Sequence, residues 1–304
     1  MTASHPLHDE SPTGTGGRPL PGAPLDSTAQ LMNAITSRLG SQLGLVSLNG
    51  TRRPAPPPLV LVAHGSRDPR ALGTVRTLVE RVRELRPHLS VRLGHIELDE
   101  PLLPATLASI DTDRDPRAVL VPLLLSRGHH VKRDVPDAAA AVPGLRARVA
   151  APLGPHPLLV ETLYERLVEA GWRTRPSDAA RRASGVVLAA AGSRDPEAAV
   201  DTRRTARLLA ERLGVPVVAA YASAAAPTVP AAVRAMAARG RHRIAVASYF
   251  TAPGRFATAC AEAAPWIAAA PLGAHPAMAR LVLHRYDQAL ATPEPASERE
   301  LAAT

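Results

Sequence analysis

The feature that most constrains the fold of this 304-residue chain is an internal duplication. The segment VVLAAAGSRDPEA, residues 186–198, repeats LVLVAHGSRDPRA, residues 59–71, at an offset of 127 residues. PLGAHP near residue 274 likewise repeats PLGPHP near residue 155. A repeat carried through the same order of segments indicates two copies of one folding unit in tandem.

Within each copy, short apolar runs alternate with longer segments of helical periodicity. In the first copy this pattern predicts strands at residues 58–63, 90–98, 117–125 and 146–153. It predicts helices at residues 69–85 and 101–110, from residue 134, and at residues 157–170. Strands that alternate with helices pair in parallel through right-handed crossovers. We therefore predict an α/β fold with two tandem lobes, each a parallel four-stranded sheet with helices on both faces.

Composition marks the limits of the two lobes. Residues 1–57 are rich in Pro, Gly, Ser and Thr and are expected to form a disordered tail, although residues 27–48 have helical spacing. The first lobe is predicted at residues 58–176 and the second at residues 184–292, with a loose polar tail at residues 293–304.

Charge and composition exclude several classes of protein. The formal net charge is +9, but 35 of the 36 basic residues are Arg, aromatic residues make up only 3%, and no zinc-finger spacing or basic helix is present, so no nucleic-acid partner is expected. The apolar runs are far shorter than the roughly 20 residues that span a bilayer, so no membrane segment is expected. The start of the chain lacks a secretory signal, and a single cysteine, Cys260, suits a reducing compartment. We expect a cytoplasmic protein in which nitrogen and oxygen atoms hold any metal.

Three ligand-capable residues each follow the apolar run of a different predicted strand: His64, Glu97 and His130. The carboxyl ends of neighbouring parallel strands converge on one crevice, so these groups should meet there. Two imidazoles and one carboxylate suit Fe, Co, Ni or Zn. A lone His in such a place is more often a hydrogen-bonded loop residue.

The duplication favours a functional role for the trio. The second copy places Ala191, Ser223 and Phe256 at the three corresponding positions. It therefore keeps the framework of the repeat and loses all three ligand-capable groups. This joint loss indicates a function confined to one site per chain.

The GSRDP motif is present in both copies, so a structural role explains it best. Gly65 permits the turn after the strand, and Asp68 with Pro69 begins the following helix. Ser66 and Arg67 have a second possible role, because a helix start can bind an anionic substrate.

Three segments together resemble a known family. AHGSRD, the Glu of HIELDEP, and GHHVKRDVP resemble the signature segments of the sirohydrochlorin chelatases, the small class II tetrapyrrole chelatases. The resemblance covers about residues 58–292, with a degenerate second lobe. It implies that His64 and His130 bind metal and accept protons, with Glu97 beside them as a third catalytic and metal-binding group. The family pattern GxHVxxDIP selects His130 rather than the adjacent His129, which we expect at the rim.

The resemblance implies insertion of a divalent metal ion into the acidic tetrapyrrole sirohydrochlorin, with the metal as substrate and no organic cofactor. Fe(II) insertion for siroheme synthesis is the favoured interpretation. The alternatives are a cobaltochelatase of cobalamin synthesis, a non-catalytic metal or tetrapyrrole carrier, and a structural protein whose second lobe docks a partner. We expect a monomer, because the second lobe would complete the cleft.

Further polar residues near these segments are candidates for secondary roles. The residues expected to contact the substrate are Ser66, Arg67, His129 and Lys132, with Arg127 and Arg133 nearby. His156 and His275 recur in both copies and are interpreted as helix-start residues, and His95 as a core histidine.

Overall fold

The computed structural model describes residues 55–113, 115–223 and 225–292. The predicted tails lie outside these residues apart from 55–57, as does the helical spacing at residues 27–48. The described residues from Pro56 to Thr292 belong to one compact unit.

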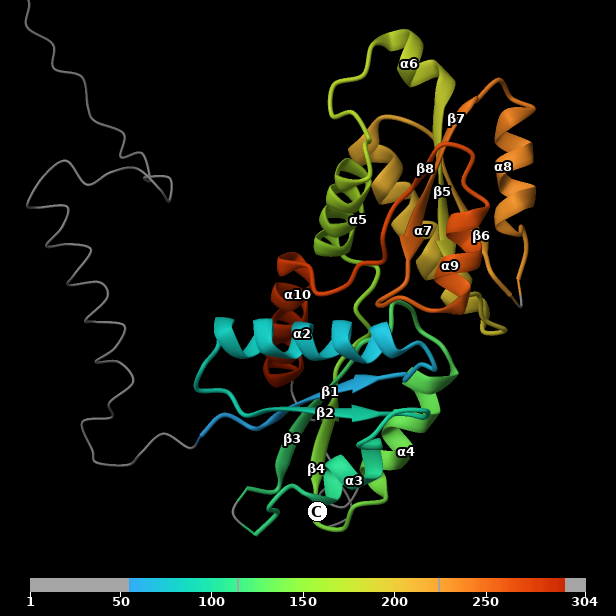
Figure 1. Cartoon of the computed structure of the whole chain (residues 1–304). Helices are drawn as coiled ribbons and strands as arrows, with labels where there is room; N and C mark the ends of the chain where they lie inside the picture. Colours follow the sequence, from blue (N-terminus) through green and yellow to red (C-terminus); the bar gives the residue numbers. More distant parts are fainter. Residues whose placement is uncertain (1–54, 114, 224, 293–304) are drawn as a thin grey trace, which may run out of the picture. The chain divides into compact units, whose positions relative to one another are not determined.

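Two parallel four-stranded sheets form the framework (Figure 1). The first has the order β2-β1-β3-β4 and contains β1 (Leu59–Ala63), β2 (Val91–His95), β3 (Arg117–Pro122) and β4 (Arg146–Val149). The second has the order β6-β5-β7-β8 and contains β5 (Ser184–Ala190), β6 (Val217–Tyr221), β7 (Arg243–Tyr249) and β8 (Ile267–Ala268). Strand pairing is parallel throughout both sheets, which confirms the predicted fold class.

Helices connect the strands, and their starts follow from local sequence. In the first copy they are α2 (Pro69–Leu85), α3 (Leu103–Ala108), the π-helical turn η1 (His130–Asp134), α4 (Val135–Ala140) and α5 (Pro157–Glu169). Next come α6 (Asp178–Ala183), α7 (Pro196–Leu213), α8 (Val229–Ala237), α9 (Arg255–Glu262) and α10 (Pro276–Ala291). Asp68 and Asp195 cap α2 and α7 by accepting the backbone N–H of Arg70 and of Glu197, the second residue of each helix. The structural role predicted for GSRDP is therefore confirmed.

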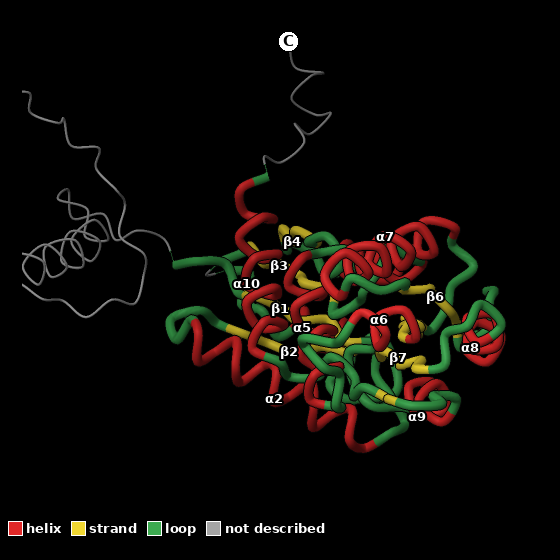
Figure 2. Tube along the Cα trace, turned by 90° about the horizontal axis from the view of Figure 1, so that it is seen from above, coloured by secondary structure: helices red, strands yellow, loops and turns green. Residues whose placement is uncertain are grey.

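Helices cover both faces of each sheet (Figure 1), and Figure 2 shows α7 and α9 on opposite sides of β7 in the second sheet. On the outer faces, α3 and α4 pack against the first sheet, and α8 and α9 against the second. The inner faces share a single hydrophobic core, to which α2, α5, α7 and α10 all contribute.

The two copies exchange helices. Although α5 follows the last strand of the first sheet, it packs against α7 and β7 of the second copy. Conversely, α10 ends the second copy but packs against α2 and β3 of the first, and its Tyr286 hydroxyl donates to the backbone oxygen of Pro57 at 2.7 Å. Each lobe is therefore covered in part by a helix from the other copy of the repeat.

The duplication is preserved in backbone detail. Gly65 and Gly192 have φ values of +98° and +92°, and a Cβ at either would lie 1.7 or 1.8 Å from the backbone oxygen of Glu97 or Ser223. Only glycine fits both turns. The Glu97 backbone N–H donates to the backbone oxygen of His64 at 3.0 Å, and that of Ser223 donates to the backbone oxygen of Ala191 at 3.0 Å. The correspondences assigned to Ala191 and Ser223 from sequence are therefore confirmed.

Candidate functional site

The three ligand-capable side chains meet at the carboxyl edge of the first sheet. His64 follows β1, Glu97 follows β2, and His130 opens η1 after β3. His64 Nδ1 lies 3.5 Å from Glu97 Oε1, and the rings of His64 and His130 stand edge to face with centroids 4.7 Å apart. Their side chains are 38–54% exposed, so a ligand from solvent can reach all three.

The trio is an open arrangement of ligand-capable side chains rather than a closed cage. Among the residues that the structure describes, no three His, Cys, Asp or Glu side chains already form a metal site. Open coordination suits a metal that must be passed on, and the nitrogen and oxygen donors suit Fe, Co or Ni.

Asp134 orients His130 from one turn further along η1. His130 Nδ1 lies 2.5 Å from Asp134 Oδ2, and an ionised carboxylate can only accept, so the Nδ1–H donates. This bond leaves the Nε2 lone pair free for a metal ion or a proton. His129 lies 3.6 Å from the other Asp134 oxygen and is 75% exposed. Sequence reasoning missed Asp134, although its four-residue spacing from His130 was a visible signal.

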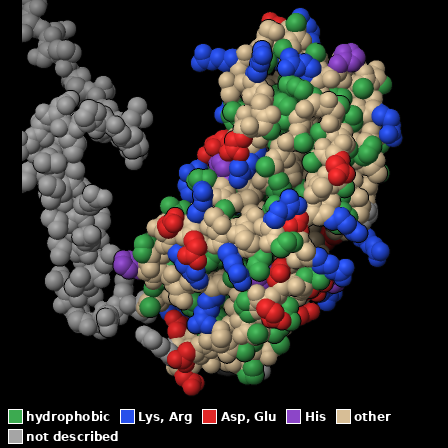
Figure 3. Space-filling view, in the orientation of Figure 1, with side chains coloured by type: hydrophobic (Ala, Val, Ile, Leu, Met, Phe, Trp, Pro, Cys, Tyr) green, Lys and Arg blue, Asp and Glu red, His purple; other side chains and the backbone are tan. Residues whose placement is uncertain are grey.

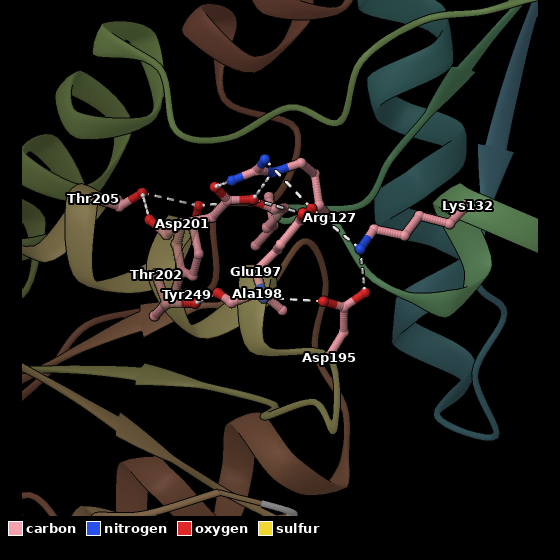
Figure 4. Close-up of polar contacts among 10 residues, drawn as sticks. Arg127, Lys132, Asp195, Glu197, Ala198, Asp201, Thr202, Thr205 and Tyr249 are labelled. Atoms are coloured by element: carbon pink, nitrogen blue, oxygen red, sulfur yellow. Dashed lines mark hydrogen bonds and ion pairs between the residues drawn. The ribbon is translucent and has the colours of Figure 1, made fainter.

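The other residues expected to contact substrate lie in different settings. The Ser66 backbone N–H donates to Asp99 at 2.9 Å, and its hydroxyl accepts the backbone N–H of Asp68 at 3.1 Å. Arg67 is exposed beside them. Lys132 lies 2.6 Å from Asp195 Oδ2 and 3.1 Å from Glu197 Oε2, so its ammonium group is held by two carboxylates of the second lobe (Figure 4).

Lys132 and Asp195 each stabilise the charged form of the other. Hydrogen bonds to Asp195 and then Glu197 raise the pKa of Lys132, and Lys132 in turn lowers the pKa of Asp195. A hydrogen bond to Asp201 raises the pKa of Arg127 in the same way. On the face shown in Figure 3, cationic and anionic side chains are interspersed.

The second lobe presents an apolar side chain where the first presents His130. Phe256, in the first turn of α9, is 37% exposed. A Cβ added to the nearby Gly254 would lie 3.7 Å from the Ser66 hydroxyl, and one added to Gly128 would lie 3.8 Å from the Ser193 hydroxyl. In each copy, therefore, the glycine that precedes this position, Gly128 or Gly254, lies beside the GSRDP turn of the other copy.

The remaining histidines singled out in the sequence are structural. His95 is 1% exposed, and its Nδ1–H donates to the backbone oxygen of Pro101 at 3.2 Å, as expected of a core residue. His156 and His275 accept the backbone N–H of Leu158 and Ala277 and cap α5 and α10, which confirms their predicted role. None of the described helices combines the length and apolarity needed to cross a membrane.

Two curated relatives are similar to this chain in sequence. The sirohydrochlorin cobaltochelatase of Methanococcus aeolicus is 35% identical over 79 residues, 26% of this chain and 55% of that protein. The sirohydrochlorin ferrochelatase of Bacillus subtilis is 29% identical over 164 residues, 52% of this chain and 59% of that protein. The chain thus spans little more than half the length of these relatives.

Two solved structures have the same fold. SirB from Bacillus subtilis with Fe3+ superposes with a TM-score of 0.62 at 21% identity, over 78% of this chain and 96% of that one. CbiX, described as the terminal enzyme for biosynthesis of siroheme in denitrifying bacteria, superposes with a TM-score of 0.58 at 21% identity, over 77% of this chain and all of that one. The CbiX family model matches residues 58–170 and again residues 185–289, one match for each lobe. The chain therefore belongs to the CbiX family.

Proposed function

We propose that this protein is a chelatase that inserts a divalent metal ion, Fe(II) in the favoured version, into sirohydrochlorin. The observation that carries the proposal is the pair of adjacent imidazoles, His64 and His130, with Glu97 at 3.5 Å from the first, at an open sheet edge. Family membership and the activities for which the relatives are named support it.

Metallation requires the removal of two pyrrole N–H protons while an ion is presented to the ring nitrogens. A neutral imidazole can hold the ion or accept a proton. In the proposed mechanism His130, oriented by Asp134, and His64 present the metal to one face of the macrocycle. As the ion passes to the ring nitrogens, the imidazole lone pairs that held it are freed and take up the two pyrrole N–H protons. Glu97 lies beside His64, where it balances the charge and passes the proton towards solvent.

The substrate carboxylates require cationic partners near this edge. Arg67 is exposed next to Ser66, and Arg133 is exposed within η1, so these two arginines are the best placed. His129 is exposed at the rim, whereas Lys132 can take part only by giving up its contacts with Asp195 and Glu197. We further propose that the protein is cytoplasmic and that it acts as a monomer. The monomer is supported by the shared core, since one chain supplies both lobes of it.

A cobaltochelatase is the closest alternative, since imidazole and carboxylate ligands do not separate Fe(II) from Co(II) or Ni(II). The Methanococcus aeolicus relative is named as a cobaltochelatase, which favours keeping this alternative. A non-catalytic carrier would use the same groups but bind without repeated turnover.

The test is anaerobic turnover with sirohydrochlorin, followed by the absorbance of the macrocycle, with Fe(II), Co(II) and Ni(II) supplied separately. Multiple turnovers with one ion ahead support a chelatase and indicate its metal. His64→Ala should lower kcat by about 100-fold or more, the range expected for a lost proton acceptor. The control is His88→Ala, an exposed histidine that precedes β2 at the opposite edge of the sheet. Folded wild-type protein that gave no acceleration with any ion would indicate a carrier.

A further inference from the structure

The second lobe holds the segment that carries His130, residues 125–134. After β3 ends, this segment crosses to η1, and its recorded polar contacts with other parts of the described chain go to the second lobe. The Tyr249 hydroxyl, at the end of β7, donates to the backbone oxygen of Leu125 at 2.9 Å. Arg127 and Lys132 bind carboxylates at the start of α7 (Figure 4).

Asp201 is the centre of this contact. It is a 2% exposed residue of α7 that accepts three hydrogen bonds from Arg127: from the backbone N–H at 2.9 Å, Nε at 3.0 Å and Nη2 at 2.7 Å. A carboxylate bound by the planar guanidinium fork fixes direction as well as distance. Because Asp201 also binds the backbone N–H, it fixes the path of the main chain three residues before His130.

A second polar link supports the same segment. Thr205, one turn after Asp201 on α7, lies 3.2 Å from the Tyr249 hydroxyl through its own hydroxyl. Tyr249 is buried at 3% exposure, so its bond to Leu125 is shielded from water. The entry to the segment is therefore fixed at Leu125 and again at Arg127.

Comparison of the two copies shows that the carboxylate contacts with residues 125–134 are specific to the second lobe. At the repeat offset of 127 residues, Asp201 corresponds to Thr74, and Glu197 corresponds to Arg70. In the first lobe Arg70 neutralises its own helix cap, Asp68, at 2.7 Å. In the second lobe Glu197 stands there instead, and the cap Asp195 is left to bind Lys132.

The second lobe lacks the two cationic side chains that a corresponding contact with the first lobe would need. At the offset of 126 residues, Pro253 and Thr258 stand where the first copy has Arg127 and Lys132. The second lobe has thus lost three ligand-capable groups. It carries instead two carboxylates, Asp201 and Glu197, that contact residues 125–134 of the first lobe, which keeps those groups.

We propose that Asp201, assisted by Glu197 and Asp195, is a positioning residue that holds the His130 segment so that the His130 ring stays beside that of His64. The inference rests on the proposed function and assigns the second lobe a part in it. Small displacements of a reacting group can cost about 100-fold in rate, so a rigid anchor three residues away is expected to matter.

The test compares Asp201→Asn with the wild type by two independent readouts. The first is steady-state turnover with sirohydrochlorin and the better of Fe(II) and Co(II). The second is NMR of the imidazole carbon-bound protons, because edge-to-face rings 4.7 Å apart shift each other's resonances. The matched control is Glu211→Gln, which neutralises an exposed carboxylate on the same helix. Asp201→Glu tests whether a restored charge rescues both readouts.

We expect Asp201→Asn to lower kcat about 30- to 100-fold with KM changed by less than about threefold, and to move the His64 and His130 resonances towards those of isolated rings. Glu211→Gln should change neither. A folded Asp201→Asn protein with wild-type kcat and wild-type resonances overturns the proposal.

A variant that fails to fold and a wild type without turnover each have a defined consequence. If Asp201→Asn does not fold, the double variant Arg127→Gln with Asp201→Asn, which removes both charges of the pair, takes its place under the same criteria. If the wild type has no turnover, the proposed function fails, and the NMR comparison alone decides whether Asp201 positions the ring.

Discussion

Among single side chains, Asp134 has the most direct influence on the chemistry of His130. Its carboxylate accepts the His130 Nδ1–H and so keeps the Nε2 lone pair directed outward. In Asp134→Asn the amide can also donate, which favours the other tautomer. We predict that kcat falls about 10- to 100-fold with little change in KM, the range seen for partners of metal-binding histidines. Asp137→Asn, an exposed carboxylate in the first turn of α4, is the control and should retain activity in the same turnover assay.

Sequence reasoning found the residues at the site that depend on local position. His64, Glu97 and His130 could be predicted to meet because each follows a strand of a parallel sheet. Asp201 could not be predicted, because its role depends on a contact with a residue 74 positions away in the other lobe. Lys132 was identified as a cation near the site, but nothing in its neighbourhood in the sequence indicated that Asp195 binds it.

Among the elements, α5 has a cap that should make stability depend on pH. Burial, reinforced by Arg285 and His284, lowers the pKa of His156 to about 4, against 6.5 for an ordinary histidine. The neutral ring accepts the backbone N–H of Leu158 at 3.1 Å, which a protonated Nδ1 cannot do. Between these two pH values the unfolded chain binds a proton that the folded chain does not. The stabilisation is therefore complete above about pH 6.5 and is lost as the pH falls towards 4.

We predict that His156→Asn, which retains an N-cap, loses less stability than the wild type between pH 7.5 and pH 4.5. The full pKa difference corresponds to about 3 kcal/mol, and partial solvent access reduces the expected effect to about 1–2 kcal/mol. Urea unfolding at the two pH values measures it. The exposed His88→Asn serves as control and should follow the wild type, and an equal loss of stability in all three proteins would contradict the assignment.

Element type was predictable from periodicity, whereas three strand ends of the first copy were not. The apolar runs predicted strands to residues 98, 125 and 153, but β2 ends at His95, β3 at Pro122 and β4 at Val149. Pro122 has no N–H to continue the ladder, Leu98 has a φ of +68°, outside the strand region, and the last residue of β4 that pairs with β3 is Val149, opposite Leu120. The ends of β2 and β3 depend on the backbone turning towards the site, which hydrophobic periodicity does not register.

At the scale of the whole molecule, the exchange of α5 and α10 was beyond sequence reasoning. Both copies have the same helical period, so the sequence pattern alone would let the apolar stripe of α10 pack against either sheet equally well. The structure packs α10 against α2 and β3, and α5 against α7 and β7. Because a single core spans both lobes, truncation of a side chain on one side should destabilise the other side equally.

Leu281 on α10 tests this coupling, since it is 0% exposed in the shared core. We predict that Leu281→Ala lowers the free energy of unfolding by about 2–4 kcal/mol. The two tryptophans, Trp172 and Trp266, lie 5.7 Å apart and line one surface pocket with Arg243 of β7, so their fluorescence reports the second lobe. The urea midpoint from fluorescence should therefore fall together with that from far-UV circular dichroism, which reports all helices. Leu290→Ala, on the same helix but 36% exposed, should cost much less. A fluorescence midpoint that stayed in place while the dichroism split into two steps would mean that the lobes unfold separately, and an anchor such as Asp201 would then join two independent bodies instead of two faces of one.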